Sequence, residues 1–496
     1  MVRFGSGSYK IKECLVNKIA GSAAGYVLVA TFLLGFTSCG GGGASGAPGS
    51  PSTAVSDSTE ASSGSLGVFL SSGNATVAAP TVTISSPGSG GGNSTVTSSS
   101  KAYLITLPNA QNSSPSYTAI SCSGMSAIGG INLDTQHSVG VAFDTTSPTL
   151  EFFTFTGGSP PSVSSTCYYF TLSGSSPIVT SAGQTSVGGV VMDPSIQTAI
   201  VETGSGFQFV DYSNPSHPGS SSYPRIPPYS SSSPGGIDLV ENFAYDPYLI
   251  VGGVSYKMIL SGSGAVSYSQ ADSDGNLLEL ADIETGTIYR PDGPTQAVFS
   301  AGRNGLCTAD AIGIDTDYQV AIIGCEYDAF SKPSYPSVFS PVTILVNLND
   351  LVLNASLGTY SLPLSAVVSV TLTNSPPPQN NIFVDSVNHI VMWGSGGDWG
   401  NSSANDFSVA KLSDPFTSFG SGIVGGTATL SSLVPPSGGS WVGYGYPHGS
   451  AMYVDSSGNS VALWMNHAAN LLAMVKANEI LAGANPSTAV TYVTIP

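Results

Sequence analysis

Charged side chains are scarce in this chain. Asp, Glu, Lys and Arg make up 8% of its 496 residues, whereas a typical soluble protein has about 25%. The 30 acidic residues outnumber the 12 basic ones, which gives a formal net charge of −18 at pH 7. Four of the basic residues precede Cys39, and the others are scattered singly. No basic patch is present that could neutralise phosphates, so the sequence predicts no nucleic-acid partner.

Common catalytic and cofactor motifs are missing as well. The sequence has no CxxC or CxxCH pair, no HExxH and no GxSxG. These absences remove zinc ribbons, thioredoxin-like sites, c-type haem, metalloproteases and α/β-hydrolases from the candidate functions. The glycine runs at 40–43 and 88–92 do not lie between a strand and a helix, so no nucleotide-binding loop is predicted. The sequence leaves the cofactor unknown.

Glycine, proline and small polar residues are abundant instead. The chain has 60 Gly and 33 Pro, and 41% of its residues are hydrophobic. This composition indicates many turns, little helix and enough apolar side chains for a core. The low charge density fits either a surface solvated by hydroxyl and amide groups or an acidic habitat, in which carboxylates are protonated.

The first 38 residues have the layout of an export signal. A basic stretch is followed by the apolar core 26–36 and by small residues at Thr37 and Ser38. Thr37-Ser38-Cys39 resembles the lipobox of bacterial lipoproteins, in which the cysteine carries the lipid. The resemblance implies a lipid anchor at Cys39, and Gly40 after it implies passage to the outer membrane or cell surface. The alternatives are ordinary secretion and an uncleaved anchor.

Two further regions are expected after the signal. Residues 39–100 are rich in Gly, Ser, Thr, Ala and Pro, a composition that buries too little apolar surface to offset the entropy of ordering. They are predicted to form a disordered, flexible tether. The folded domain is predicted to span 101–496.

Four cysteines fall within or close to that domain: Cys122, Cys167, Cys307 and Cys325. An even number in an exported protein indicates disulfides, with three possible connectivities. Cys307 and Cys325 flank the apparent hairpin 311–324. We therefore predict the pairs Cys307–Cys325 and Cys122–Cys167.

A repeat runs through the predicted domain. In each copy an apolar stretch ends in Asp, a short polar turn follows, and a second apolar stretch begins. The six aspartates are Asp134, Asp193, Asp246, Asp315, Asp385 and Asp455. Each copy is followed by a third strand-like run. The third runs are 150–160, 207–218, 277–286, 344–354, 407–416 and 471–483.

This pattern predicts an all-β protein, most simply a β-propeller. It resembles the loosely conserved repeats of bacterial NHL, YVTN and lactonase-like propellers over about residues 101–496. Six blades are expected, or seven if 256–300 contains another unit. The segments 102–107 and 488–495 are expected to share the closing blade. The alternative fold is a pair of β-sandwich domains.

Three groups of residues are candidates for a site. The repeated aspartates could hold a metal or act as acids, but regular placement favours a role in capping turns through backbone N–H groups. Four oxygen-bearing side chains have the spacing of part of a calcium loop, namely Asp272, Asp274, Asn276 and Glu279. Several aromatic residues and one histidine lie among glycines, in a context that suits stacking on a sugar or gripping a partner. These candidate binding residues are Trp399, Trp441, Tyr444, Tyr446 and His448.

The sequence therefore predicts a surface-anchored, non-catalytic propeller that binds an envelope protein or a glycan through its loops. One alternative is a lactonase-like or other propeller hydrolase that acts on a small extracellular substrate. Another is a structural protein of the envelope. An enzyme would gather unlike polar side chains at one mouth of the channel, whereas a binding protein would present its loops.

Overall fold

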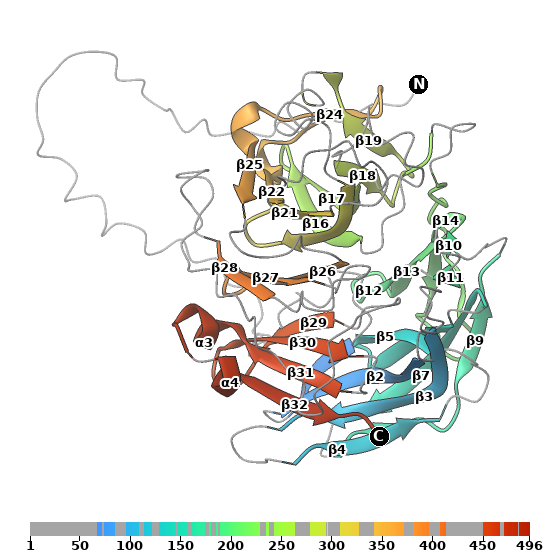
Figure 1. Cartoon of the computed structure of the whole chain (residues 1–496). Coiled ribbons are helices and arrows are strands. Elements are labelled where there is room, and N and C mark those ends of the chain that lie inside the picture. The colour runs from blue at the N-terminus through green and yellow to red at the C-terminus, as the bar shows by residue number, and fades with distance from the viewer. Residues whose placement is uncertain are drawn as a thin grey trace, which may run out of the picture. The chain divides into compact units, whose positions relative to one another are not determined.

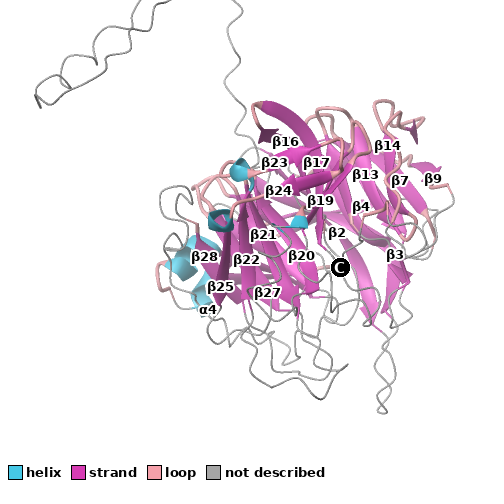
Figure 2. Ribbon diagram, turned by 90° about the horizontal axis from the view of Figure 1, so that it is seen from above, coloured by secondary structure: helices cyan, strands magenta, loops and turns pink. Residues whose placement is uncertain are grey.

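The structure is a computed structural model in which strands dominate. The ranges that it describes are 67–71, 74–84, 96–108, 114–121, 128–144, 147–156, 160–173, 178–179, 185–186, 189–228, 235–237, 243–262, 278–293, 295, 308–326, 342–371, 380–395, 407–412, 450–466, 471–484 and 486–496. Figure 2 shows these strands in magenta with a few short helices in cyan. None of the described helices is long and apolar enough to cross a membrane.

The strands form seven antiparallel sheets in chain order, which we call blades 1 to 7. Blade 1 contains β1 (Gly67–Ser71), β2 (Asn74–Ile84), β3 (Val96–Thr106) and β4 (Ser116–Ile120). Blade 2 contains β5 (Ile128–Asp134), β6 (Val139–Asp144), β7 (Thr149–Thr156), β8 (Ser162–Val163) and β9 (Tyr168–Thr171). Blade 3 contains β12 (Val190–Asp193), β13 (Thr198–Thr203), β14 (Gly206–Asp211) and β15 (Gly219–Ser220). A separate pair, β10 (Ile178–Val179) and β11 (Thr185–Ser186), precedes blade 3.

The remaining blades follow the same meander. Blade 4 contains β16 (Ala244–Val251), β17 (Val254–Gly262), β18 (Leu278–Asp282) and β19 (Ile288–Pro291). Blade 5 contains β20 (Thr308–Asp315), β21 (Val320–Glu326), β22 (Val342–Asn347) and β25 (Val367–Thr371). Blade 6 contains β26 (Asn380–Asp385), β27 (Ile390–Ser395) and β28 (Phe407–Lys411). Blade 7 contains β29 (Ser450–Val454), β30 (Ser460–Asn466), β31 (Leu471–Lys476) and β32 (Val490–Thr494), with the short helices α3 (Ala477–Leu481) and α4 (Pro486–Ala489) before β32.

Seven apolar clusters join the blades into a closed ring. Each cluster draws its side chains chiefly from two blades that follow one another, from the pair 1–2 to the pair 6–7. The seventh cluster packs Val77 and Ile105 of blade 1 against Leu463 and Leu472 of blade 7. Figure 1 shows these first strands, in blue, beside the last strands, in red. Because each blade is covered on both faces, strands such as β13 read as continuous buried runs rather than as alternating ones.

The all-β propeller is confirmed, and it has seven blades rather than six. Five of the six Asp-containing segments form the first hairpins of blades 2, 3, 5, 6 and 7, whereas 241–253 contains the single strand β16 of blade 4 and the turn after it. The six third runs each contribute a strand to blades 2 to 7. The additional blade does not lie in 256–300, because that region contributes to blade 4. It lies at the N-terminal side, where β1 and β2 come from residues expected to belong to the tether. The folded part therefore begins by Gly67, not near 101.

The expected closing blade is wrong. Residues 96–106 form the third strand of blade 1, whereas 490–494 form the fourth strand of blade 7. Each of the two blades is thus built from one continuous part of the chain. The predicted third run at 344–354 is also broken, because β22 ends at Asn347 and a 3-10 turn, η2 (Leu348–Asp350), follows.

Candidate functional site

The repeated aspartates cap the turns that follow them. One carboxylate oxygen of each, Oδ1, accepts hydrogen bonds from backbone N–H groups two to four residues further along. Asp134, for example, accepts from the backbone of Gln136 at 2.9 Å and of His137 at 3.0 Å. The same contact is present at all six positions. The turn-capping interpretation is therefore confirmed, except that Asp246 precedes a bulge in β16 rather than the hairpin turn itself.

Four of these turns end in a residue with left-handed backbone. They are the four described non-glycine residues with positive φ: Ser138, Gln197, Gln319 and His389, at φ of 47° to 57°. Each occupies the fourth position after its aspartate. This conformation reverses the chain tightly, so that the second strand starts at the next residue, at a cost in steric strain.

The second carboxylate oxygen, Oδ2, reaches the neighbouring blade. At five junctions it accepts a hydrogen bond from a side chain of the next blade, and we call this series the belt. The donor and acceptor pairs are Tyr212–Asp134 at 2.8 Å, Tyr245–Asp193 at 2.7 Å, Gln319–Asp246 at 2.9 Å, His389–Asp315 at 3.0 Å, and Ser460–Asp385. The belt therefore links blades 2 to 7 in order.

The belt lies in the protein interior. All five acceptor aspartates are at most 2% exposed. Burial raises the pKa of Asp246 to about 6, although the bonds from Tyr248 and Gln319 lower it. Burial also raises the pKa of Asp315, against the bond from His389. The His389 ring in turn stacks on Tyr318, with centroids 3.5 Å apart.

A second feature projects from the same end of the ring as the Asp-containing turns. In blade 4 the hairpin continues beyond Asp246 to the turn at Gly252 and Gly253. In blade 5 an insertion, 348–366, separates β22 from β25 and contains η2, β23 (Val352–Asn354), β24 (Thr359–Ser361) and η3 (Leu364–Ala366). We call the hairpin 246–256 and the insertion 348–366 together the platform.

The platform packs on the core between blades 4 and 5 and has an apolar surface. Leu249 and Val251 of the hairpin share a cluster with Leu348, Leu351 and Tyr360 of the insertion. The strand β24 also pairs in parallel with β19, which extends blade 4. Nine large hydrophobic side chains are exposed within the described part of the chain, and six of them lie on the platform. These six are Tyr248, Ile250, Val254, Val352, Leu357 and Leu364, which are 54% to 72% exposed.

The predicted aromatic site lies outside the described residues. This holds for Trp399, Trp441, Tyr444, Tyr446 and His448. The segment with Trp399 joins β27 to β28, and the other four residues belong to the segment that joins β28 to β29. The strand β27 ends, and β28 begins, at the end opposite the Asp-containing turns, whereas β28 ends beside the Asp385 turn and β29 begins at the opposite end.

The structure describes only one of the four predicted calcium ligands, Glu279. Asp272, Asp274 and Asn276 lie outside the described residues. Glu279 is buried on β18, where it accepts a 2.5 Å hydrogen bond from Nε of Arg290, and Arg290 also donates to the carbonyl of Gly236. Glu279 therefore neutralises an arginine in this structure. Within the described ranges, no group of three or more His, Cys, Asp and Glu side chains is arranged to hold a metal ion.

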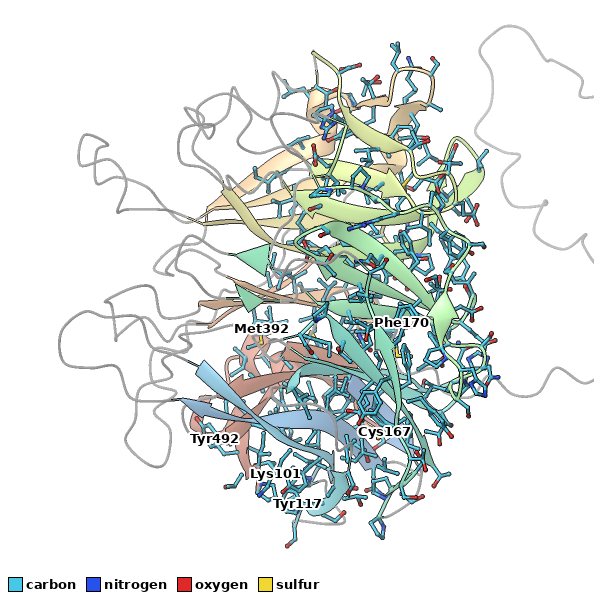
Figure 3. All side chains as sticks on the ribbon, turned by 90° about the vertical axis from the view of Figure 1, so that its right-hand side faces the viewer. Lys101, Tyr117, Cys167, Phe170, Met392 and Tyr492 are labelled. Atoms are coloured by element: carbon cyan, nitrogen blue, oxygen red, sulfur yellow. The ribbon has the colours of Figure 1, made fainter. Side chains whose placement is uncertain are left out.

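The cysteine pairings remain predictions. Cys167 is disulfide-bonded and packs against the cluster between blades 1 and 2, but its expected partner Cys122 lies outside the described residues. Figure 3 labels Cys167 beside the sheets of this region. Cys325 pairs in register with Ala309, and Cys307 also lies outside the described residues.

Two features were missed at the sequence level. The belt donors are Tyr, Tyr, Gln, His and Ser, so no single residue type identifies them, although Gln319 and His389 share the fourth position after an aspartate. The platform was missed because residues 344–354 have the composition of one strand. The available signal was the run 351–373, which contains no charged residue.

Comparisons with known proteins give neither a family nor an activity. No family model and no curated protein matches the chain. Among solved structures, a putative 6-phosphogluconolactonase from Bacteroides uniformis is similar at 8% identity and a TM-score of 0.41, covering 84% of this chain and 97% of that one. Hydrazine synthase from Kuenenia stuttgartiensis is similar at 8% identity and a TM-score of 0.41, covering 75% and 84%. Hsv2 from Kluyveromyces lactis is similar at 10% identity and a TM-score of 0.38, covering 81% and 95%. At these identities and TM-scores no activity is carried over to this chain.

Proposed function

We propose that this chain is a surface-anchored, non-catalytic propeller that binds an envelope protein, and that the platform is its contact surface. Cys39 would carry the lipid anchor. The observation that supports the proposal is the gathering of six exposed apolar side chains on two elements that project from one end of the ring. Monomeric soluble proteins rarely expose such side chains together unless they bind something.

The blade faces and the repeated carboxylates are engaged in holding the ring together. Both faces of the blades are covered by neighbouring blades, and the repeated carboxylates cap turns and bond the next blade. These groups are not arranged as a pair in unlike environments, which acid–base catalysis needs. The platform differs because Leu249, Leu348 and Tyr360 bury its inner side in the cluster between blades 4 and 5, whereas six large apolar side chains on it are exposed.

The platform's chemistry defines the partner. Its only acidic residues are Asp246, which is buried, and Asp350, which bonds Asn347, and it contains no basic residue. Electrostatic attraction therefore contributes little, and burial of apolar area at about 25 cal/mol per Å² supplies the affinity. A matching partner presents an uncharged apolar patch, as the cores of protein–protein interfaces do.

Photo-crosslinking in intact cells tests this proposal. A photoreactive amino acid replaces Val352 of the platform in the full chain and, as the control, Tyr169 on blade 2, which is 45% exposed. We expect one adduct of defined mass from position 352 and none of that mass from position 169. The adduct should disappear in a Leu357→Ser/Leu364→Ser background. No adduct, the same adduct at both positions, or an adduct with lipid alone would overturn the proposal.

The enzymatic alternative has a separate test. Purified full-length protein is incubated with a panel of small lactones, and opening of the ring is followed by proton release. We expect the rate to equal that of buffer. Hydrolysis that the untagged, pure protein accelerates would establish the alternative and contradict the non-catalytic assignment, whatever the crosslinking shows.

A further inference from the structure

Gln319 of blade 5 contacts both parts of the platform. Its side-chain oxygen accepts a hydrogen bond from the backbone N–H of Ile250, in the hairpin 246–256, at 3.3 Å. Its side-chain nitrogen donates to Oδ2 of Asp246, at the base of that hairpin, at 2.9 Å. Its backbone carbonyl accepts from the N–H of Leu348, where the insertion begins, at 2.8 Å. The hairpin is therefore bonded to blade 5 through the same side chain that bonds Asp246.

A bulge separates the hairpin from the rest of blade 4. The register between β16 and β17 shifts between Asp246 and Leu249. The regular ladder is interrupted at such a place and the strand bends. Beyond the bulge, Leu249 and Val251 pack into the cluster that blades 4 and 5 share, and Ile250 bonds Gln319. A hinge at the bulge lets the hairpin leave blade 5 while the remainder of blade 4 keeps its pairing.

Asp246 is a buried carboxyl at this hinge. Its side chain is 0% exposed, and the groups that donate to it are neutral: the backbone N–H of Tyr248, at 2.8 Å, and the amide of Gln319. Burial raises the pKa of Asp246 to about 6, although these two bonds lower it, and the reference value is 3.8. Ionisation therefore favours a conformation in which water reaches the carboxylate.

Titratable side chains on β16, β17 and β18 surround Asp246 within blade 4. Lys257 of β17 pairs with Glu284 at 3.2 Å, and Asp282 of β18 accepts a bond from Thr285 at 2.7 Å. These charges are thus engaged with partners of their own. Phenols ordinarily ionise near pH 10, roughly four units above the range of interest, and the tyrosines on β16 and β17 are Tyr245, Tyr248 and Tyr256.

Further titratable groups face Asp246 from blade 5. Asp315 bonds His389 at 3.0 Å, and burial raises the pKa of Asp315 as well. Asp317 in the same turn and Asp350 on η2 are both exposed, so water and salt screen their charges. Asp350 also accepts a bond from Asn347 at 3.1 Å. The variants below separate the effect of Asp246 from that of Asp315.

We propose that Asp246 makes the platform sensitive to pH: the hairpin 246–256 stays on blade 5 in acidic surroundings and leaves it more often as Asp246 loses its proton. The hairpin carries Tyr248, Ile250 and Val254, half of the exposed apolar side chains of the platform. The contact surface is therefore complete for more of the time at acidic pH, and the partner should bind more tightly there. This consequence for the partner rests on the proposed function, whereas the movement of the hairpin does not.

Hydrogen exchange of the full chain in detergent, read by mass spectrometry, tests the movement. Peptides that cover the hairpin are compared at pH 5 and pH 7.5, and each rate is divided by that of the unstructured sequence at the same pH. We expect protection to be about ten-fold higher at pH 5, which follows from a pKa of about 6 in the closed hairpin and 3.8 in the open one.

Peptides of β13 and β14 show whether the opening is local. They are interior strands of blade 3 and should be more protected than the hairpin at both pH values. Equal protection of the hairpin at pH 5 and pH 7.5 would overturn the proposal. Protection of the hairpin that matches β13 and β14 would also overturn it, because the hairpin would then open only with the whole ring.

Two variants that each remove one carboxyl identify the group responsible. Asp246→Asn should abolish the pH dependence of hairpin protection. Asp350→Asn is the matched control, because its carboxyl is on the platform but exposed, and it should keep the ten-fold difference of the wild type. A pH dependence that survives in Asp246→Asn, or that is lost in both variants, would assign the effect to another group.

Photo-crosslinking from position 352 in cells held at the two pH values tests the consequence for the partner. The yield of the adduct should fall several-fold from pH 5 to pH 7.5 in the wild type and in Asp350→Asn, and should not depend on pH in Asp246→Asn. A constant yield from the wild type would overturn the regulation and leave the proposed function intact. Absence of the adduct at both pH values would contradict the proposed function, and hydrogen exchange would still decide whether the hairpin moves.

Discussion

The phenolic hydroxyl of Tyr245 on β16 donates a 2.7 Å hydrogen bond to Oδ2 of Asp193 at the end of β12, one blade earlier. Both side chains are buried, and the proximity of Asp193 adds to burial in raising the pKa of Tyr245. The oxygen that accepts this bond is not the one that caps the turn, since Ser195 bonds Oδ1. One carboxylate thus fixes a turn within its blade and the position of the next blade.

Loss of a belt donor should destabilise the protein. In Tyr245→Phe the ring keeps its packing, but Oδ2 of Asp193 loses its donor in the interior, which costs about 1–3 kcal/mol. Urea unfolding of the purified protein measures the difference. Tyr248→Phe is the control, because that ring is 59% exposed, and its effect should stay within about 0.5 kcal/mol. Equal losses in both variants would contradict a specific role for Tyr245.

Substitution by glycine should change stability in opposite directions at two glutamines that occupy the same turn position. Gln197 and Gln319 both have left-handed backbone, at φ of 47° and 53°. Glycine relieves this strain, so Gln197→Gly should be neutral or stabilising by up to about 1 kcal/mol. Gln319→Gly loses the bonds to Asp246 and to Ile250, and should be destabilising. Thermal unfolding of the two variants gives the comparison, and stabilisation of both would show that the Gln319 side chain is dispensable.

Asp246 should make stability depend on pH. Its pKa is about 6 in the folded protein and 3.8 as the reference value. Because the folded pKa is raised, the folded state binds the proton more tightly. Its contribution to stability is full below about pH 4, falls as the pH rises, and is lost above about pH 6. The change is about 3 kcal/mol.

The measurement is the unfolding free energy from pH 3 to 8 for wild type and Asp246→Asn. The difference between the two unfolding free energies should vary across this pH window, because the variant lacks the carboxyl of Asp246 and keeps every other carboxyl. A difference that is constant from pH 3 to 8 would show that Asp246 has an ordinary pKa.

The packing of blade 5 against blade 6 can be tested by a substitution at Gly313. A Cβ atom added to Gly313 on β20 would lie 2.7 Å from Cγ2 of Ile382 and 2.8 Å from Cγ2 of Val384, both on blade 6. Gly313→Ala should therefore push blades 5 and 6 apart and cost about 1–3 kcal/mol. Gly293→Ala is the control, because no atom lies within 4 Å of its added Cβ. If the two variants unfold at the same urea concentration, blades 5 and 6 do not pack as described.

Much of the fold could be predicted from the sequence because each repeat carries its own turn signal. Asp315 and Asp385 mark hairpins that form at the expected positions, since their carboxylates cap local backbone. Blade 1 was missed because its buried residues are small. Val77, Ala78 and Ala79 give β2 the composition of a linker, and only the neighbouring blades supply the surface that orders it.

The belt and the platform could not be predicted in the same way. Tyr212 bonds Asp134 across 78 positions of the chain, and Gln319 bonds Asp246 across 73. Such pairs depend on the packing of blades, which no local pattern encodes. The platform requires β24 to pair with β19 of another blade, again a contact that only the closed ring creates.

A double-mutant cycle between Asp193 and Tyr245 tests most directly the central claim that the repeated carboxylates join the blades. Unfolding free energies are measured for wild type, Asp193→Ala, Tyr245→Phe and the double variant, with Tyr248→Phe replacing Tyr245→Phe in a control cycle. The account predicts a coupling energy of about 1–2 kcal/mol for Asp193 with Tyr245 and about zero for Asp193 with Tyr248. A coupling near zero in both cycles would contradict it.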